Sequence, residues 1–485
     1  GKAENGKEKF IIAILTFNNK KGQYISMTTL LAINWASVGL QAGQLILSLS
    51  ILVIIHELGH YLTAKWFKCR VEKFYLFFDP WFSLFKKKVG ETEYGVGWLP
   101  LGGYVKIAGM IDESMDKEQM NKPPQPWEFR SKPAWQRLII MIAGVTMNIL
   151  LAFFIYSMIL LVWGEKKVPV DSMKYGLAFR DSLMIDLGFK NGDKILAVND
   201  QPIEDLDDIV KKLILGDHVS IEREGKRETI TLPVDLIGKL VEKKRSRTPL
   251  LEPRIPVVVK ELQDSGNAAK AGFLSGDQII AVNGEPAVFF DELKTVLAAH
   301  RDQTIDVSIL READTLSLPT AVTAEGTIGF YPVSAIPDLD SMGVLKLRVT
   351  RYSMLDAFPA GVKMAGDQLQ FYIDQFKKIL SPQTGAYKGV GGFKAMGSIF
   401  PDSVWDWESF WRITAFFSIV LAFMNLLPIP ALDGGHVMFT LYEMISGRKP
   451  SDKFLEYAQI AGMVILFGLL IYANGNDWFG WGRGK

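Results

Sequence analysis

Residues 35–64 form a long apolar stretch whose only charged or imidazole side chains belong to the pentapeptide His56-Glu57-Leu58-Gly59-His60. Such a stretch can cross roughly 30 Å of hydrocarbon as a helix, in which every backbone amide finds a hydrogen-bond partner within the segment. On that helix the two histidines lie one turn apart on the same face, which suits two imidazole nitrogens binding one zinc ion. Glu57 lies beside that ion, where it can accept a proton from a bound water molecule. Because ionisable groups at membrane depth are costly and therefore functional by default, the pattern predicts an intramembrane zinc hydrolase.

Three further stretches without charged side chains, residues 138–164, 413–431 and 459–476, are also long enough to cross a membrane. The sequence therefore predicts an α-helical membrane protein with four transmembrane helices. The connections between the first and second stretches and between the third and fourth carry many lysines and arginines, which marks the cytoplasmic side. Both termini and the large region 165–410 are then expected on the opposite side, which in a bacterium is the periplasm.

The overall composition agrees with membrane spans joined to a polar soluble part, because 48% of the residues are hydrophobic and 22% are charged. A net charge of +1 gives no indication of nucleic acid as a partner. The single cysteine, Cys69, excludes an intrachain disulfide and a zinc site built from several cysteines.

The region between the second and third stretches contains an internal repeat. Gly188-Phe189 and the run 192–199 (GDKILAVN) recur 84 residues later as Gly272-Phe273 and the run 276–283 (GDQIIAVN). Each copy predicts a turn, a strand, a helix and a further strand, with the helices at 206–213 and 291–299 and the last strands at 219–223 and 305–310. The repeated string resembles tandem PDZ domains, which are α+β domains that add an extended peptide to a sheet edge. Two rigid spacers without a ligand remain the alternative.

A catalytic zinc site needs a third protein ligand besides the two histidines. Asp433 follows the third stretch, in a segment that Pro428 and Pro430 interrupt. Unwound backbone at membrane depth is tolerated only where it lines a cavity or is buried in protein, so we expect a kinked helix to bring this carboxylate to the metal. Glu72, after the first stretch, and His436 are the alternatives.

Two further segments have recognisable patterns. Residues 93–110 alternate glycine with β-forming residues and predict a hairpin or a sheet edge near the membrane, where a substrate could pair as an added strand. Residues 356–380 carry apolar side chains at helical spacing and predict an amphipathic helix that lies on the membrane surface or, preferably, packs against protein.

Taken together, His56-Glu57-x-x-His60 and the later Asn425-x-x-Pro428-x-Pro430-x-Leu432-Asp433-Gly434 resemble the site-2 protease family. Four spans with two PDZ domains between the second and third resemble its RseP-type branch. The run 101–106 (LGGYVK) resembles the family's membrane-associated β-loop, and Gly144-x-x-x-Asn148 resembles a segment of its second span.

The resemblance implies a complete set of site residues and a substrate class. Zinc would be bound by His56, His60 and Asp433, with Glu57 as the catalytic base, and substrate would be bound by Asn425, Gly102, Gly103, Tyr104 and Val105. The substrate would be a single-span membrane protein already trimmed outside the membrane, such as an anti-sigma factor or a remnant signal peptide. The other implied partners are membrane lipid and peptide ligands of the PDZ domains, and the implied location is the bacterial inner membrane with periplasmic PDZ domains.

The predicted domain organisation follows from these assignments. It comprises an N-terminal extension of unclear role (1–34), a first transmembrane half (35–164), PDZ domains at 165–250 and 251–335, a linker with the amphipathic helix (336–409) and a second transmembrane half (410–485). Two other functions are compatible with parts of the pattern. A membrane-anchored PDZ scaffold or chaperone would lack proteolysis, and a surface zinc protease would place its motif outside the bilayer, which the apolar flanks of the motif disfavour.

Overall fold

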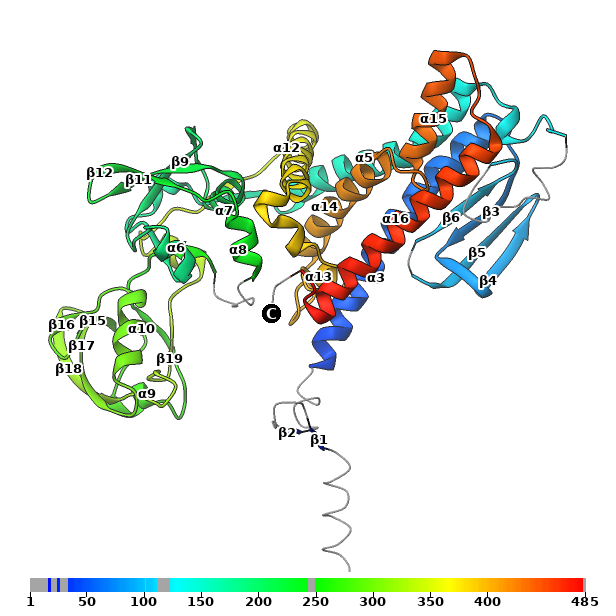
Figure 1. Ribbon diagram of the computed structural model, residues 1–485. Coiled ribbons are helices and arrows are strands. Elements are labelled where there is room, and N and C mark those ends of the chain that lie inside the picture. Colours follow the sequence, from blue (N-terminus) through cyan, green and yellow to red (C-terminus); the bar gives the residue numbers. More distant parts are fainter. Residues whose placement is uncertain are drawn as a thin grey trace, which may run out of the picture. The chain divides into compact units, whose positions relative to one another are not determined.

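The computed structural model describes residues 16–18, 24–26, 34–100, 102–110, 123–242 and 249–482. The chain folds as two compact units (Figure 1), which comprise Gly1–Val162, Met354–Leu369 and Gly391–Phe479 in unit 1, and Trp163–Ser353, Gln370–Val390 and Gly480–Lys485 in unit 2. Most of the predicted N-terminal extension lies outside the described residues, as does Leu101 of the predicted β-loop. Two short strands of the extension, β1 (Thr16–Asn18) and β2 (Tyr24–Ser26), form an antiparallel pair.

Four long helices dominate unit 1, and within the described residues they are the ones long and apolar enough to cross a membrane. They are α3 (Trp35–Trp66), α5 (Ala134–Val162), α14 (Trp407–Leu426) and α16 (Asp452–Phe479). Each contains most of one predicted stretch, so the prediction of four membrane-length helices is confirmed. The α5 helix packs against α3, α14 and the shorter α15 (Asp433–Ser446). Large apolar side chains on α16, such as Val464 and Phe467, remain more than half exposed, as expected of a surface that faces lipid.

The third predicted stretch is not one kinked helix, which corrects that expectation. The α14 helix ends at Leu426, and Asp433 is the first residue of a separate helix, α15. The two prolines between them lack an amide hydrogen and restrict the residue that precedes each of them, so helical hydrogen bonding cannot continue. Ala431 adopts a φ of 81°, in the left-handed region that is uncommon for a residue with a Cβ.

The α16 helix holds this break in place. Its buried Gln459 accepts a hydrogen bond from the backbone amide of Ala431 at 3.1 Å. A Cβ atom at Gly462 would lie 1.6 Å from the carbonyl oxygen of Pro430, so only glycine allows the loop to approach this closely. The position of Asp433 is thereby fixed by a helix that lies later in the chain.

A four-stranded sheet follows α3 in unit 1. Its strands are β3 (Val71–Leu76), β4 (Phe78–Val89), β5 (Thr92–Leu99) and β6 (Tyr104–Ile107), in the order β4-β5-β3-β6. Because β3 lies between β5 and β6, parallel to the first and antiparallel to the second, the predicted hairpin within 93–110 is wrong. The alternative of a sheet edge is correct for β6, which among the described strands pairs only with β3.

The remaining helices of unit 1 connect these parts. They are η1 (Phe129–Ser131), α13 (Phe393–Gly397) and the first part of α12 (Met354–Leu380), which confirms the helix expected at 356–380. The first part of α12 packs closely on α5. A Cβ at Gly361 would lie 2.5 Å from the Ser157 backbone, so glycine permits this approach. This contact agrees with the preference for packing against protein.

Unit 2 contains two similar subdomains, which we call repeat 1 and repeat 2. Repeat 1 has a sheet of order β10-β9-β11-β12, and repeat 2 has a sheet of the same relative order, β16-β15-β17-β18. Their strands and helices are β9 (Lys194–Val198), β10 (Gln201–Pro202), α7 (Leu206–Leu215), β11 (His218–Arg223) and β12 (Lys226–Thr231), then β15 (Gln278–Val282), β16 (Glu285–Pro286), α10 (Phe290–Ala299), β17 (Thr304–Arg311) and β18 (Asp314–Ala321). The predicted order of strand, helix and strand is confirmed in both copies.

Shorter elements complete unit 2. They are β7 (Glu165–Lys167), η2 (Val170–Ser172), β8 (Leu177–Phe179), α6 (Ser182–Asp186), α8 (Leu236–Glu242), β13 (Leu251–Pro253), β14 (Val259–Leu262), α9 (Asn267–Ala271), β19 (Phe330–Pro332), α11 (Ile336–Ser341), β20 (Arg348–Thr350), the end of α12, η3 (Pro382–Thr384) and η4 (Ala386–Gly389).

The recurring Gly-Asp pair has the same structural role in both repeats. The buried Asp193 carboxylate accepts hydrogen bonds at 2.8 Å from Nε and from the terminal nitrogen of Arg223, and Asp277 accepts the same pair from Arg311. Each carboxylate also accepts a bond from a backbone amide three residues before it, which closes the turn. The motif is thus explained by a buried ion pair that joins a turn to a distant strand.

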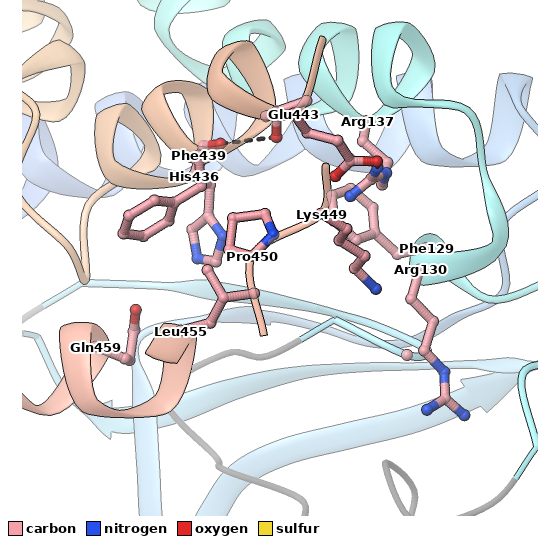
Figure 2. Close-up of a pocket in the computed structure, with 12 residues that line it drawn as sticks. Phe129, Arg130, Arg137, His436, Phe439, Glu443, Lys449, Pro450, Leu455 and Gln459 are labelled. Carbon is pink, nitrogen blue, oxygen red and sulfur yellow. Dashed lines mark hydrogen bonds and ion pairs between the residues drawn. The ribbon is translucent and has the colours of Figure 1, made fainter. Parts of the chain in front are cut away.

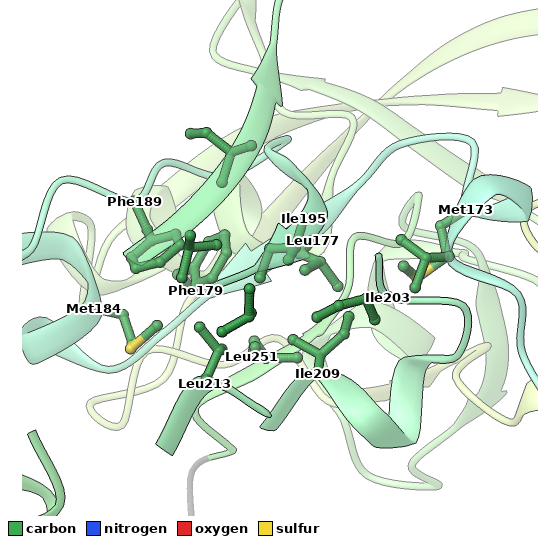
Figure 3. Close-up of a cluster of buried hydrophobic side chains, with 14 of the residues drawn as sticks. Met173, Leu177, Phe179, Met184, Phe189, Ile195, Ile203, Ile209, Leu213 and Leu251 are labelled. Carbon is green, nitrogen blue, oxygen red and sulfur yellow. The ribbon is translucent and has the colours of Figure 1, made fainter. Parts of the chain in front are cut away.

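The core of repeat 1 draws on residues far apart in the chain (Figure 3). Phe179 and Phe189 stack with ring centroids 4.9 Å apart, and Leu251 closes the same cluster. The strand β13 that carries Leu251 pairs with β8 of repeat 1, although it lies beyond residue 250, the predicted end of the first copy. Leu339 from α11, after repeat 2, is also buried in this core.

Candidate metal centre

Two imidazoles and one carboxylate converge inside unit 1. Nε2 of His56 lies 3.1 Å and Nε2 of His60 3.3 Å from Oδ2 of Asp433, and the two nitrogens lie 3.2 Å apart. Both histidines are 6% exposed, so the two imidazoles are shielded from bulk solvent, and Asp433 is half-buried. Within the described part of the chain, this is the one set of three such side chains arranged so that it could hold a metal ion.

A hydrogen bond from Nδ1 of His60 leaves its other ring nitrogen, Nε2, free to bind a metal. We call Nε2 of each histidine the inner nitrogen. Nδ1 of His60 lies 2.8 Å from the backbone carbonyl oxygen of Ile140 on α5. A carbonyl only accepts, so Nδ1 carries the hydrogen, and Nε2 of the neutral ring directs a lone pair at Asp433. A ligating histidine is commonly oriented by such a bond from its other ring nitrogen.

His56 also has a hydrogen-bond partner on α5. Its Nδ1 faces the completely buried amide of Asn148, with Nδ2 at 3.3 Å, while the amide oxygen of Asn148 has no hydrogen-bond partner among the described residues. Rotating this amide by 180° places the oxygen against Nδ1, where it can accept a hydrogen bond from the ring, since Asn oxygen and nitrogen occupy equivalent positions. Nδ1 then carries the hydrogen, and the second inner nitrogen is also free.

The resulting arrangement fits a divalent cation. Two nitrogen lone pairs and a carboxylate oxygen within about 3.3 Å repel each other unless a cation or a shared proton lies among them. Oδ2 of Asp433 is buried and has no hydrogen-bond partner among the residues described. Two imidazoles and one carboxylate are a donor set that zinc prefers in catalytic sites.

Two glycines let the helices approach and leave room at the rings. A Cβ at Gly144 would lie 2.4 Å from Nε2 of His60 and 2.7 Å from Cε1 of His56, and a Cβ at Gly59 would lie 2.5 Å from the carbonyl oxygen of Ala143. Both positions therefore require glycine where α3 and α5 meet. The motif Gly144-x-x-x-Asn148 places the glycine beside the imidazole rings and the amide that faces His56 on one face of α5. The motif is visible in the sequence, but no local pattern there assigns either residue to the site.

The other candidates for the third ligand lie elsewhere. Glu72 is on β3 and forms an ion pair with Lys106 at 3.6 Å. His436 lies one turn after Asp433 and lines a separate pocket, outside the set of three ligand atoms. Among the described residues, Asp433 is therefore the one candidate of the three whose carboxylate lies beside the histidine nitrogens.

Glu57 lies between the two histidines in sequence and contacts the start of β6. A Cβ at Gly103 would lie 3.5 Å from Cγ of Glu57 and 2.6 Å from the Val53 side chain, so the glycine permits this close approach. The backbone amide of Val105 lies within hydrogen-bonding reach of the Glu57 carboxylate. The predicted catalytic and β-loop residues are therefore neighbours in space.

Side chains from β3 and β4 orient this part of β6. The Tyr104 ring stacks on Tyr75, and its hydroxyl donates to Oδ1 of Asp79 at 2.9 Å. Burial, followed by this hydrogen bond, raises the pKa of Tyr104, which keeps the hydroxyl protonated and able to donate. Gly102 has a φ of 149°, and a Cβ there would lie 3.1 Å from the Phe78 ring.

Asn425, in the last turn of α14, reaches the same centre. Its Nδ2 lies 3.4 Å from Nε2 of His56. Asn425 thus joins His56, His60 and Asp433, while Gly103 and Val105 contact Glu57 from the start of β6.

Membrane-length helices around a His–His–Asp cluster with an adjacent glutamate are the arrangement expected of a membrane metallohydrolase. Residues 44–469 match the model of peptidase family M50, so the chain belongs to that family and is a metalloprotease. This match confirms the resemblance to site-2 proteases.

Several bacterial proteins are similar over nearly their whole length. The regulator of sigma-E protease RseP of Escherichia coli is 26% identical over 466 residues, which cover 90% of this chain and 97% of that protein. A protein of Thermotoga maritima named "Putative zinc metalloprotease" is 28% identical over 500 residues, covering 88% of this chain and 96% of its own. A Treponema pallidum protein of the same name is 26% identical over 454 residues, with 88% and 96% coverage.

Proposed function

We propose that this protein is an intramembrane zinc metalloprotease that hydrolyses a peptide bond within the transmembrane segment of a single-span membrane protein. The observation that carries the proposal is the convergence of His56, His60 and Asp433 within about 3.3 Å, in a unit of membrane-length helices. These three side chains would hold the zinc ion. When bound in this way, zinc lowers the pKa of a water molecule towards neutrality and polarises the scissile carbonyl.

Glu57 and Asn425 would supply the remaining chemistry. The Glu57 carboxylate accepts the proton of the attacking water and returns it to the leaving amine. The Asn425 amide, 3.4 Å from His56, donates a hydrogen bond to the carbonyl oxygen as negative charge develops there. Neither group needs to move far, because both already lie beside the cluster.

The edge of β6 would present the substrate. A transmembrane helix hides its peptide bonds in internal hydrogen bonds, so the segment to be cut must unwind. Gly102, Gly103, Tyr104 and Val105 offer backbone groups at a sheet edge next to Glu57. Pairing there replaces the hydrogen bonds that the substrate loses.

The repeats would decide which proteins reach the site. We assign repeats 1 and 2 as the PDZ domains predicted at 165–250 and 251–335, with β13 added to the first, on the periplasmic side of the inner membrane. They exclude bulky ectodomains or bind a peptide end exposed by an earlier cut. The substrates are then pre-trimmed proteins such as an anti-sigma factor or a remnant signal peptide, in keeping with the relative named for sigma-E regulation.

The test compares wild type with Glu57→Gln, each purified in detergent with zinc, on a pre-trimmed single-span substrate. Mass spectrometry locates the cut, and metal analysis verifies that both proteins hold zinc. We expect a cut inside the apolar segment by wild type alone, abolished by a zinc chelator. Glu72→Gln is the matched control, since this carboxylate pairs with Lys106 away from the cluster and its loss should leave cleavage intact. Equal cutting by Glu57→Gln would refute the assigned base, and no cutting by any zinc-loaded protein would favour a scaffold.

A further inference from the structure

A second pocket lies in unit 1, apart from the three proposed metal ligands. It is formed by η1, the start of α5, residues 436–443 of α15 and the start of α16, and its volume is about 60 Å³ (Figure 2). A pocket needs roughly 10–15 Å³ of such space for each water molecule that it holds, so this one has room for a small polyatomic group such as a phosphate. These helix ends adjoin the lysine-rich and arginine-rich connections that mark the predicted cytoplasmic surface.

The pocket has more positive than negative charge. Arg137 is paired with Glu443 at 2.5 Å, and Arg130 is paired with Glu128 at 2.6 Å. Lys449 also lines the pocket and has neither an ion pair nor a hydrogen bond with any residue that the structure describes. Lys449 is therefore the lining cation whose charge no described carboxylate neutralises, and one phosphodiester would neutralise it.

The opposite wall is largely apolar. Figure 2 shows Phe439, Pro450 and Leu455 on one side, together with His436 and Gln459, and Lys449, Arg130 and Arg137 on the other. A free phosphate ion gains nothing from such a wall, whereas the glycerol and first acyl carbons of a lipid would be buried against it. Basic pockets between membrane helices on the cytoplasmic side are suited to anionic lipid headgroups.

We propose that this pocket binds the phosphate headgroup of an anionic phospholipid, with Lys449 as its principal cation and the apolar wall against its glycerol. The pocket adjoins the support of Asp433. His436 lies one turn after Asp433 on α15, and Gln459 holds the Ala431 amide in the loop that precedes it. A bound lipid therefore ties α5, α15 and α16 together beside the segment that positions this carboxylate.

The test measures lipid retention by the full-length protein rather than proteolysis. Native mass spectrometry counts phosphatidylglycerol and phosphatidylcholine molecules that stay bound after titration in detergent, for wild type and Lys449→Ala. Arg448→Ala is the matched control, because it removes the same charge from the neighbouring exposed residue, which does not line the pocket. One cation near a lipid surface contributes about fivefold in affinity. We expect Lys449→Ala to lose about fivefold for phosphatidylglycerol and Arg448→Ala to stay within about twofold of wild type.

Three results would overturn the proposal. Equal losses in the two variants would mean that only the overall surface charge attracts lipid. Equal retention of phosphatidylcholine and phosphatidylglycerol by wild type would mean that the surplus charge recognises nothing. Thermal protection by inorganic phosphate that depends on Lys449, without tight phosphatidylglycerol binding, would identify a soluble phosphate as the ligand instead. Because none of these readouts uses cleavage, the lipid site and the proposed protease activity can fail independently.

Discussion

Replacing Gly144 by alanine is expected to displace the two histidines of the proposed zinc site. The added Cβ would lie 2.4 Å from Nε2 of His60, whereas ordinary van der Waals contact begins at 3.4 Å. The shortfall, 3.4 minus 2.4, is about 1 Å, which is several times the roughly 0.2 Å tolerance of metal–ligand distances. We therefore expect zinc affinity to fall by at least the ~10–100-fold seen when a group that orients a ligand is lost. Overpacking where α3 meets α5 should also cost about 1–3 kcal/mol of stability.

The assay is zinc competition against a chromophoric chelator, with thermal unfolding of the same samples. Gly43→Ala is the matched control, because it lies in α3 and a Cβ there would have no neighbour within 4 Å. That variant should bind zinc normally and gain about 0.5–1 kcal/mol, since glycine inside a helix is unfavourable. Wild-type zinc affinity in Gly144→Ala would refute the reasoning, because the inner nitrogens would then not face Gly144.

Three further predictions concern the surroundings of the site and the repeats. Asn148→Leu should lower zinc affinity about 10–100-fold with little loss of fold, measured by the same competition. Gln459→Leu leaves the Ala431 amide unsatisfied and should cost about 1–3 kcal/mol in chemical unfolding. In repeat 2, burial raises the pKa of Asp277, but hydrogen bonds from Arg311 and from a backbone amide lower it by more. The net pKa of Asp277 is therefore below its ordinary value. The ionised Asp277 therefore stabilises the folded state. This contribution is fully present above the ordinary aspartate pKa of about 3.9 and is lost as the pH falls through the lower pKa of the folded state. Arg311→Met should thus weaken hydrogen-exchange protection of residues 278–282 at pH 7 and show a smaller loss on acidification.

Controls separate these effects from general damage. Thr146→Leu on α5 changes an exposed side chain and should leave zinc affinity unchanged, unlike Asn148→Leu. Protection of residues 194–198 in repeat 1 should be unaffected by Arg311→Met, because Arg223 supplies the equivalent pair there. Equal loss in both repeats would contradict the assignment of the effect to Asp277.

Local sequence patterns were enough to predict the long helices and the cluster. Long uncharged runs have few alternatives in a membrane, and His56 and His60 share a face at any helical geometry. The prolines before Asp433 signalled a break, but proline patterns do not distinguish a kink from a helix end. That outcome depends on Gln459 and Gly462 of α16, which hold the loop through contacts that no local pattern contains.

The sheet after α3 was predicted less well for a related reason. Strand β4 is mostly exposed and contains the lysine run at 86–88, and β3 is short and carries Glu72 and Lys73, so their composition resembles a polar connection. Strand order was also hidden, because β5 and β6 are neighbours in sequence and β3 is inserted between them in space. Pairing between distant segments is set by packing, which a search for hairpins does not test.

The geometry of the metal cluster depends most on a helix that supplies none of its ligands. Ile140, Gly144 and Asn148 follow each other at intervals of four residues and form one face of α5. The first accepts from His60, the second leaves space beside both rings, and the third meets His56. The same helix packs against α14 and α15, which carry Asn425 and Asp433. Ligand motifs mark the atoms that would bind a metal, but this face of α5 fixes the tautomers and the spacing that make them a site. Selection for metal binding should therefore act on α5 as strongly as on the ligands.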